Sequence, residues 1–364
     1  MIKYLKSLAD KFMKASPVKK ALAVFLALVY LLALFSVIVK VNVVVVTPGT
    51  LNGTAYTKAS EKPVGAVKIE TDNKPGAIYT IGVYSHIRVT YFQHLISRLS
   101  RDIDVDDYNP GADLSKREEI IRGEIHREFA MQHALIVAYE EAAKVDESIH
   151  IEYDFKGLIV SAVFPGSKSN LEPRDFITHI NGTKIAGISD FSTRLAGITG
   201  NTAFTLTILR QDKGEYAEKN VSAQKTLYDG DYKLGVELQE YYVIDKEKTT
   251  PKFTIAERMP SLGSSGGAMT ALAIYNSLIE EDITDGKIIC GTGTINVDGK
   301  VGAIGGIEQK IVTAQLNNVE VFFVDEYDYE AAKAKYDEIK ADFQLISVAE
   351  FADIIAALRG DTDE

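Results

Sequence analysis

The sequence predicts an α+β protein in which one transmembrane helix precedes a larger mixed domain of sheets and helices, interrupted by a small β-rich module. Three observations support this prediction. Residues 21–39 form an uncharged apolar run. Residues 152–225 alternate short strand-like runs with turns, as small β-rich modules do. On both sides of this module, strand-like segments accompany longer stretches whose apolar residues recur at helical spacing, which predicts a domain built in two parts.

The apolar run from Ala21 to Val39 predicts a membrane-spanning helix. A helix of this length rises roughly 28 Å at 1.5 Å per residue, about the thickness of the hydrocarbon core. Residues 1–20 carry six lysines and one aspartate. This positive flank predicts a cytoplasmic N-terminus and export of residues 41–364. No small-residue cleavage motif follows the run, which favours an uncleaved signal-anchor over a cleaved signal peptide.

Composition excludes several classes of function. The net charge of −11 argues against a general nucleic-acid binder, because a polyanion would be repelled. Cys290 is the only cysteine; it lies in an apolar run that predicts an inert residue of a buried strand. The six histidines form no HExxH motif and no GxxxxGK[ST] motif occurs, so no metal, nucleotide or other cofactor is predicted.

The first part of the larger domain, residues 42–150, begins with the β-branched run Val41–Thr47, and Pro48 and Gly49 predict a turn that closes it. Residues 64–70 and 77–83 predict further strands. A long helix is predicted from Ser115 to about Lys144, with Ser115 as N-cap and Glu118 three residues later.

The β-rich module contains predicted strands at residues 157–163, 176–182, 203–209 and 216–222, with a short helix at 188–198 and a further strand at 232–238. The run Lys156–Val160, the turn Pro165–Lys168 and the segment Asp175–Gly182 together resemble a bacterial PDZ domain. The resemblance implies that an extended peptide adds as a strand. We expect its binding residues to be Gly157, Leu158, Ile159 and Val160, with the loop before Leu158 holding a terminal carboxylate.

The second part, residues 228–358, contains the Gly/Ser-rich loop Pro260–Gly267, followed by a helical stretch at 268–281. Glycines allow a substrate to approach the backbone closely. The helix start offers unpaired N–H groups that stabilise an oxyanion. Taken alone, the loop also fits a plain helix cap or a phosphate cradle.

The segments that follow this loop change the balance between these interpretations. Residues 291–295 (GTGTI), a predicted turn at 298–302 and residues 304–311 (IGGIEQKI) resemble the proteolytic domain of Lon. The resemblance places a catalytic nucleophile at Ser265 and a lysine base at Lys310, with Thr292 supporting this dyad. Gly263 and Ser264 belong to the same motif. Ser264 replaces the usual proline, which leaves Ser264 as the alternative nucleophile.

Membrane anchor, PDZ-like module and Lon-like domain together resemble the YlbL/SepM group of Lon-like PDZ proteases. The resemblance implies an exported, membrane-anchored, ATP-independent serine endopeptidase that cleaves peptides or accessible protein segments. A catalytically silent peptide-binding scaffold is the alternative. Lon-like domains often assemble as rings, so a homo-oligomer remains open. The expected segments are a basic cytoplasmic N-terminus (1–20), the anchor (21–39), the first Lon-like part (42–150), the PDZ domain (152–225), the catalytic part (228–358) and a tail (359–364).

Overall fold

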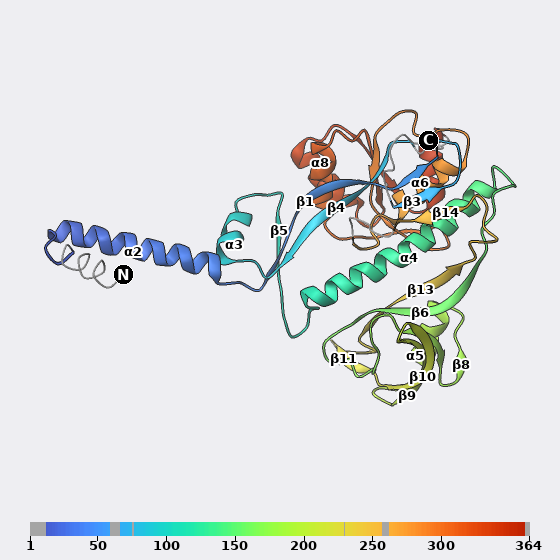
Figure 1. The fold of residues 1–364 in the computed structure, drawn as a ribbon, viewed down its shortest axis with the longest axis horizontal. Coiled ribbons are helices and arrows are strands. Elements are labelled where there is room, and N and C mark those ends of the chain that lie inside the picture. Colours follow the sequence, from blue (N-terminus) through green and yellow to red (C-terminus); the bar gives the residue numbers. More distant parts are fainter. Residues whose placement is uncertain (1–11, 59–65, 75, 229, 257–261, 361–364) are drawn as a thin grey trace. The chain divides into compact units, whose positions relative to one another are not determined.

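The computed structural model describes residues 12–58, 66–74, 76–228, 230–256 and 262–360 (Figure 1). The chain divides into two compact units. The first contains residues 1–46 and 85–108, and the second contains residues 47–84 and 109–364. The chain therefore leaves the first unit after residue 46, returns to it at residue 85, and leaves it again after residue 108.

The first unit is built around the helix α2 (Pro17–Ile38), which contains most of the predicted spanning segment. Ser16 caps its N-terminus, where Pro17 occupies the first turn. α2 is long and apolar enough to cross a membrane. The unit also contains the short helix α3 (Tyr91–Ser97) and the strand β5 (Asp104–Asp107). β5 pairs antiparallel with the first residues of β1 (Val43–Gly53).

The second unit contains a largely parallel sheet with the strand order β19-β18-β15-β4-β1. Its strands besides β1 are β4 (Ile78–Ile87), β15 (Ile289–Gly291), β18 (Val321–Asp325) and β19 (Gln344–Val348). β15 runs parallel to both β4 and β18, and β18 runs parallel to β19. The apolar strand predicted around Cys290 is therefore confirmed as a central strand of this sheet.

Alternate side chains of these strands supply two separate cores, as the two-residue period of a strand requires. Ile289 and Phe323 pack into the core that holds α4 (Lys116–Ala143), α6 (Gly267–Leu278) and α9 (Phe351–Arg359). Cys290 and Phe322 pack into the core that holds α7 (Ile307–Leu316) and α8 (Tyr329–Ile339). Burial raises the pKa of the Cys290 thiol to about 12, which makes it a poor nucleophile.

Two local predictions have opposite outcomes. The long helix is confirmed as α4, whose N-cap Ser115 forms the predicted capping box with Glu118. The predicted turn at Pro48–Gly49 is wrong, because β1 continues to Gly53. A Cβ atom at position 49 would lie 2.0 Å from the carbonyl oxygen of Gly82. Glycine therefore allows two strands to approach closely there, instead of ending one of them.

A second, three-stranded sheet with the order β14-β3-β2 flanks the main core. It consists of β2 (Ala55–Thr57), β3 (Val67–Ile69) and β14 (Phe253–Ile255). The predicted turn at 298–302 is confirmed as the connection of a small hairpin, β16 (Thr294–Ile295) and β17 (Val301–Gly302).

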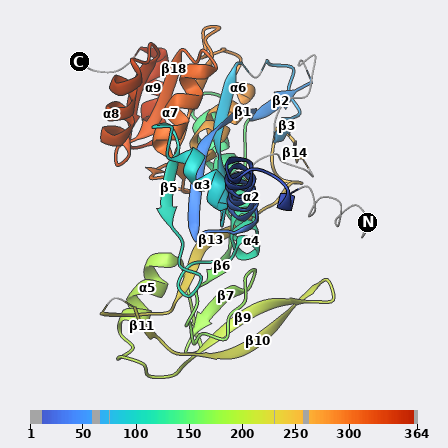
Figure 2. The same cartoon turned by 90° about the vertical axis from the view of Figure 1, so that its left-hand side faces the viewer.

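The β-rich module forms a sheet with the order β10-β9-β7-β6-β13 (Figure 2). Its members are β6 (Tyr153–Val163), β7 (Phe176–Ile180), β9 (Phe204–Asp212), β10 (Glu215–Ala223) and β13 (Val236–Ile244), and β8 (Thr183–Lys184) pairs with β7. The helix α5 (Ile188–Ala196) accompanies the sheet. Because β13 pairs with β6 from Val236 to Ile244, this sheet includes residues well beyond 225.

The strand predicted at residues 232–238 is divided in the structure. Its first part is β12 (Asp231–Lys233), which pairs with β11 (Thr226–Tyr228), and its second part opens β13. Gly235 separates the two with a φ of +72°, a left-handed conformation that turns the chain. A Cβ atom there would lie 2.5 Å from the Tyr228 hydroxyl.

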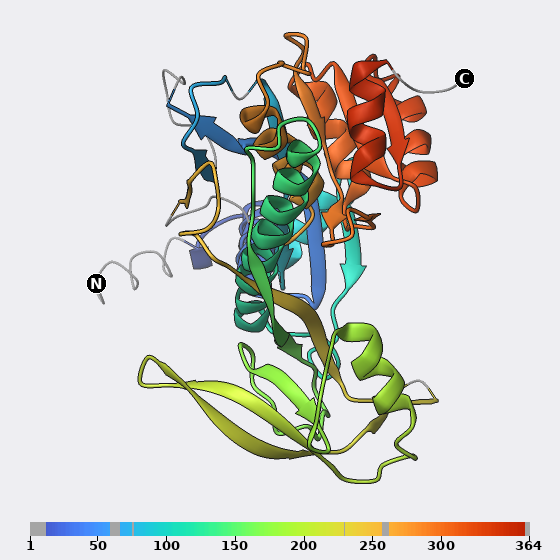
Figure 3. The ribbon, with the colours of Figure 1, turned by 90° about the vertical axis from the view of Figure 1, so that its right-hand side faces the viewer.

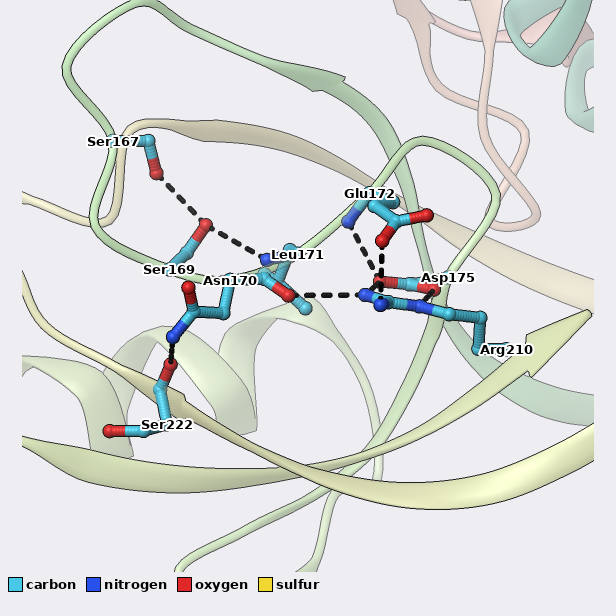
Figure 4. Close-up of polar contacts among 8 residues, drawn as sticks. All are labelled: Ser167, Ser169, Asn170, Leu171, Glu172, Asp175, Arg210 and Ser222. Atoms are coloured by element: carbon cyan, nitrogen blue, oxygen red, sulfur yellow. Dashed lines mark hydrogen bonds and ion pairs between the residues drawn. The ribbon is translucent and has the colours of Figure 1, made fainter.

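A buried ion pair holds the turn that leads into β7 (Figure 4). Asp175 is 1% exposed. Its two carboxylate oxygens accept hydrogen bonds from Nε and Nη2 of Arg210 at 2.8 and 2.7 Å. The Arg210 Nη1 atom donates to Glu172 at 2.7 Å. This two-point contact fixes both partners' orientation, which a lysine could not do.

Candidate active site

The Gly/Ser loop before α6 is fixed from both ends. The Gly263 N–H donates to the Gly123 carbonyl of α4 at 2.9 Å, and the Gly267 N–H donates to the Ser264 carbonyl at 3.0 Å. Gly263 has a φ of +90°, a conformation that favours glycine. Pro260 and Ser261 of the predicted motif lie outside the described residues. α4 thus positions the predicted nucleophile loop.

The two glycines after Ser265 are required by space. A Cβ atom at Gly266 would lie 2.6 Å from Cγ2 of Thr80, and one at Gly267 would lie 2.9 Å from Cγ2 of Ile295. The loop therefore packs directly against β4 and β16. Ser264 and Ser265 are half-buried in this arrangement.

Thr292 connects the loop to the predicted lysine. It directly follows β15, and its N–H donates to the Phe323 carbonyl of β18 at 2.9 Å. Its hydroxyl donates to the Ser265 carbonyl at 3.0 Å and accepts a hydrogen bond from Nζ of Lys310 at 2.8 Å. The Gly293 N–H adds a second hydrogen bond to the Ser265 carbonyl, at 2.8 Å. Ser265, Thr292 and Lys310, predicted from separate segments, are brought together in this way.

Lys310 lies in the first turn of α7, which begins after Gly306. Gly306 has left-handed dihedrals of φ +70° and ψ +37°. The Lys310 side chain is 2% exposed. Burial lowers its pKa from 10.5 to about 7, because the charged form loses its hydration. A lysine with this pKa is substantially neutral at neutral pH and can accept a proton.

Two carboxylates that sequence reasoning missed influence this lysine. Asp325 and Asp328 both favour the charged form of Lys310, against the larger effect of burial. Asp325 ends β18 and is fully buried. Burial and the neighbouring carboxylate of Asp328 raise the pKa of Asp325 above its usual range. Asp328 accepts a hydrogen bond from the Ile304 N–H at 2.7 Å, just before the Gly–Gly turn that leads to Lys310. The sequence signal for them is two aspartates three residues apart at the end of an apolar strand.

The dyad is not closed in this structure. Among the described residues, no hydrogen bond joins the Ser265 hydroxyl to Nζ of Lys310, and the amine is directed to Thr292 instead. Catalytic hydrogen bonds often form only when substrate is bound. The arrangement therefore supplies a serine hydroxyl and a partly neutral lysine held by one shared threonine.

The four residues predicted to bind peptide have no open edge. Leu158 and Ile159 of β6 pair with Ile177 and Phe176 of β7 on one side. On the other side, the β6 segment 157–160 pairs with residues 238–241 of β13. Leu158, Ile159 and Val160 are buried, and at Gly157 a Cβ atom would lie 2.7 Å from the Ile177 carbonyl oxygen. A peptide therefore cannot add as a strand at 157–160 without displacing β7 or β13.

The two outer strands of this sheet are β10 and β13, and β13 is the one that lies beside β6. This strand ends the sheet, and α5 lies beside it (Figure 3). A groove of about 580 Å³ runs between them, lined by Ile188, Phe191, Ser192 and Leu195 of α5, by Val236 and Leu238 of β13, and by the segment 232–235 that precedes β13. Further along β13, α4 covers the edge: Gln132 accepts from the Tyr242 N–H and His133 lies 3.2 Å from the Glu240 carbonyl. The part of the β13 edge that α4 leaves uncovered therefore lies at the groove.

A charged cluster connects the same strand to α4. Glu237 of β13 lies 2.6 Å from Nε of Arg122 and 2.7 Å from Nε2 of His126. Burial acts to raise the pKa of Glu237, but its two partners lower it to about 2. Arg122 directly precedes Gly123, whose carbonyl holds the nucleophile loop. α4 therefore contacts the grooved strand and the candidate catalytic loop within one helical turn.

Comparison with known proteins finds a similarity in the second part of the chain. Residues 250–359 match the Lon protease (S16) C-terminal proteolytic domain. A Lon protease of Mycoplasma pneumoniae is 34% identical over 96 residues, which cover 26% of this chain and 12% of that protein. The chain thus spans a small part of the relative's length. Ser265, Thr292 and Lys310 all lie within the Lon-type segment, and the match supports a serine peptidase.

Proposed function

We propose that the protein is a membrane-anchored serine endopeptidase that works without ATP, with Ser265 as nucleophile and Lys310 as base. The observation that carries the proposal is the buried amine of Lys310, whose lowered pKa suits it to proton transfer. It is hydrogen-bonded through Thr292 to the loop that presents Ser265. A serine hydroxyl is a weak nucleophile until a neighbouring base takes its proton.

In the proposed reaction, neutral Lys310 takes the proton of the Ser265 hydroxyl as its oxygen attacks the peptide carbonyl carbon. Lys310 then gives this proton to the leaving amine when the C–N bond breaks, and an acyl-enzyme remains. Water, deprotonated by Lys310, attacks the ester and releases the acid, and the serine regains its proton. Thr292 holds the amine between these steps.

The oxyanion is assigned to the start of α6. Among the described residues, the N–H groups of Ser265 and Gly266 donate to no protein acceptor. They precede a helix whose first N–H groups carry partial positive charge. Such preorganised donors stabilise the negative charge that develops in acyl transfer.

Substrate capture is assigned to the groove between α5 and β13, in place of the β6 residues predicted from sequence. A peptide strand can add there because the β13 edge is open at the groove. Apolar side chains of α5 would accept the peptide's alternate side chains. A suitable test compares Leu195→Arg with Ser189→Arg, which places the same charge on α5 outside the groove lining. We expect only the former to abolish peptide binding by the full chain in micelles; equal binding by both would contradict the assignment.

Anchoring through α2, with the remaining chain exported, completes the proposal. The lysine-rich flank supports this orientation, because positive charge is retained on the cytoplasmic side.

The catalytic proposal is tested by cleavage of an unfolded protein substrate without ATP. Ser265→Ala and Lys310→Ala should each abolish cleavage, whereas Ser264→Ala should retain it. Lys310→Arg, which keeps a charge but cannot deprotonate, should also be inactive. Activity that survives Ser265→Ala but not Ser264→Ala would transfer the nucleophile to the neighbouring serine.

A catalytically silent peptide-binding scaffold is the second candidate. The observation that favours it is the amine of Lys310, which contacts Thr292 and not the Ser265 hydroxyl. For a scaffold, the wild type would bind peptide and cleave nothing across substrates and pH values, and Ser265→Ala would leave its behaviour unchanged.

A further inference from the structure

The helix α3 of the first unit exposes an apolar surface where a water-facing helix would expose polar groups. The exposed fractions of Tyr91, Phe92, Leu95 and Ile96 are 41–48%, and that of Leu99, just beyond the helix, is 85%. By contrast, Ser97 is only 4% exposed. An amphipathic helix in water shows the reverse distribution. A run of exposed apolar side chains along one short helix marks a surface that contacts something other than water.

The chain ties this helix to the end of α2. The Tyr91 N–H donates to the Val39 carbonyl at 2.9 Å, and the Val41 N–H donates to the Val89 carbonyl at the same distance. Lys40 and Thr90 form an antiparallel bridge between these bonds. α3 also packs against α2. Its first residue therefore lies level with the last turn of the apolar helix.

Hydrogen bonds between side chains and the backbone make α3 a defined helix, so its exposed residues lie on a fixed backbone. Thr90 caps its N-terminus and forms a capping box with Gln93. The Ser97 hydroxyl donates back to the His94 carbonyl at 2.9 Å. The polar residues of this segment thus satisfy the helix itself, and its large apolar side chains are left facing outward.

Charged residues around α3 match the polar layer of a bilayer. Lys40, Arg88 and Arg98 are all exposed and flank the apolar patch in the chain. Long basic side chains next to apolar surface extend their charges toward headgroups. The acidic strand β5 pairs with Val43–Val46 of β1. Its carboxylates therefore lie outside the α3 segment that carries the apolar patch.

We propose that α3, together with Leu99, inserts into the interfacial layer of the bilayer beside the anchor, as a second membrane contact of the first unit. The occupant of the apolar surface is lipid, because the surface is continuous with the end of the proposed spanning helix. Apolar and aromatic side chains at this depth are typical of helices that lie in the membrane interface. This inference rests on the proposed anchoring by α2.

The chain contains no tryptophan, so single tryptophans report depth without background. We would compare three full-length variants in phosphatidylcholine–phosphatidylglycerol vesicles: Tyr30→Trp in α2, Leu95→Trp in α3 and Val145→Trp in the second unit. Each would be measured with lipids brominated near the headgroup and with lipids brominated near the chain ends. All three substituted side chains are exposed.

The expected result is a graded pattern. Headgroup-proximal bromines should lower Leu95→Trp emission at least about twofold and more than deep bromines do, as interfacial insertion requires. Deep bromines should quench Tyr30→Trp, and neither lipid should quench Val145→Trp. In a Phe92→Trp background, Leu95→Asp should remove most of the quenching, whereas Val145→Asp should not.

Other outcomes separate the possible failures. Quenching of Tyr30→Trp without quenching of Leu95→Trp would leave the anchor intact and overturn the interfacial helix. A blue-shifted Leu95→Trp spectrum without quenching would overturn lipid as the occupant and point to a second copy of the chain. If Tyr30→Trp were also unquenched, the proposed anchoring would fail as well. Quenching of Leu95→Trp alone would support the α3 contact and overturn the spanning role of α2.

Discussion

The burial of Lys310 has a consequence for folding stability that can be measured without a substrate. In the folded protein its pKa lies at about 7, against 10.5 for an unperturbed lysine. Between these values the unfolded chain holds a proton that the folded chain has released. Stability therefore rises with pH across this window. The stability cost of burying the charged form of Lys310 is fully present below pH 7 and disappears above pH 10.5.

Replacing the lysine by methionine should remove this penalty. The difference between 10.5 and about 7 corresponds to about 5 kcal/mol, at about 1.4 kcal/mol per tenfold change in proton binding. Loss of the hydrogen bond to Thr292 costs about 1 kcal/mol in return. Lys310→Met should thus be inactive yet more stable than wild type by about 4 kcal/mol at pH 6, an advantage reduced to about 1 kcal/mol at pH 9.

The assay is urea unfolding of the full chain in micelles at pH 6 and pH 9, followed by circular dichroism. Lys219→Met, which removes an exposed lysine of β10, serves as the matched control and should show no pH-dependent difference from wild type. If wild type and Lys310→Met had the same pH dependence of stability, the lysine would not be buried as a neutral amine, and its assignment as the base would lose its physical basis.

Four further outcomes follow. The kcat/KM of the wild type should rise through pH about 7 and then level off, as Lys310 loses its proton; a rise that begins only near pH 10 would contradict the assignment. Thr292→Val should lower kcat about 10- to 100-fold with little change in KM, while Thr292→Ser retains most activity, measured by steady-state cleavage. Gly266→Ala, whose Cβ would meet Thr80 at 2.6 Å, should lower both the melting temperature and kcat. Glu237→Gln should cost about 3 kcal/mol of unfolding free energy at pH 7, because the pKa of Glu237 is lowered from 4.5 to about 2; the wild-type advantage should disappear as pH falls from about 4.5 toward 2.

Local sequence signals predicted the elements that depend on local chemistry. Ser115 and Glu118 predicted the start of α4 because a capping box is formed by neighbouring residues. The apolar run containing Cys290 predicted a buried strand, since a strand with helices on both faces has no polar side. The same kind of signal misled at Pro48–Gly49, where the reason for the glycine is a partner strand more than 30 residues away.

In the candidate site, too, some features were predicted from the sequence and others depend on tertiary packing. The residues Ser265, Thr292 and Lys310 were predicted from their motifs, and the Lon-type match covers all three. What lowers the pKa of Lys310 is its burial in the fold, a property of packing that no motif contains. The carboxylates of Asp325 and Asp328 act on it only because β18 ends beside α7.

The sequence by itself determined where the long helix begins and which runs are buried, and it supplied the candidate site residues, because capping, periodicity and motif residues act over a few positions. The tertiary structure alone decided which strand edges are paired, since edge pairing depends on segments distant in the chain. It placed β13 beside β6, which closed the predicted peptide edge at Gly157–Val160 and left the groove beside α5. It also fixed the pKa of Lys310, because desolvation depends on the surrounding atoms rather than on sequence neighbours.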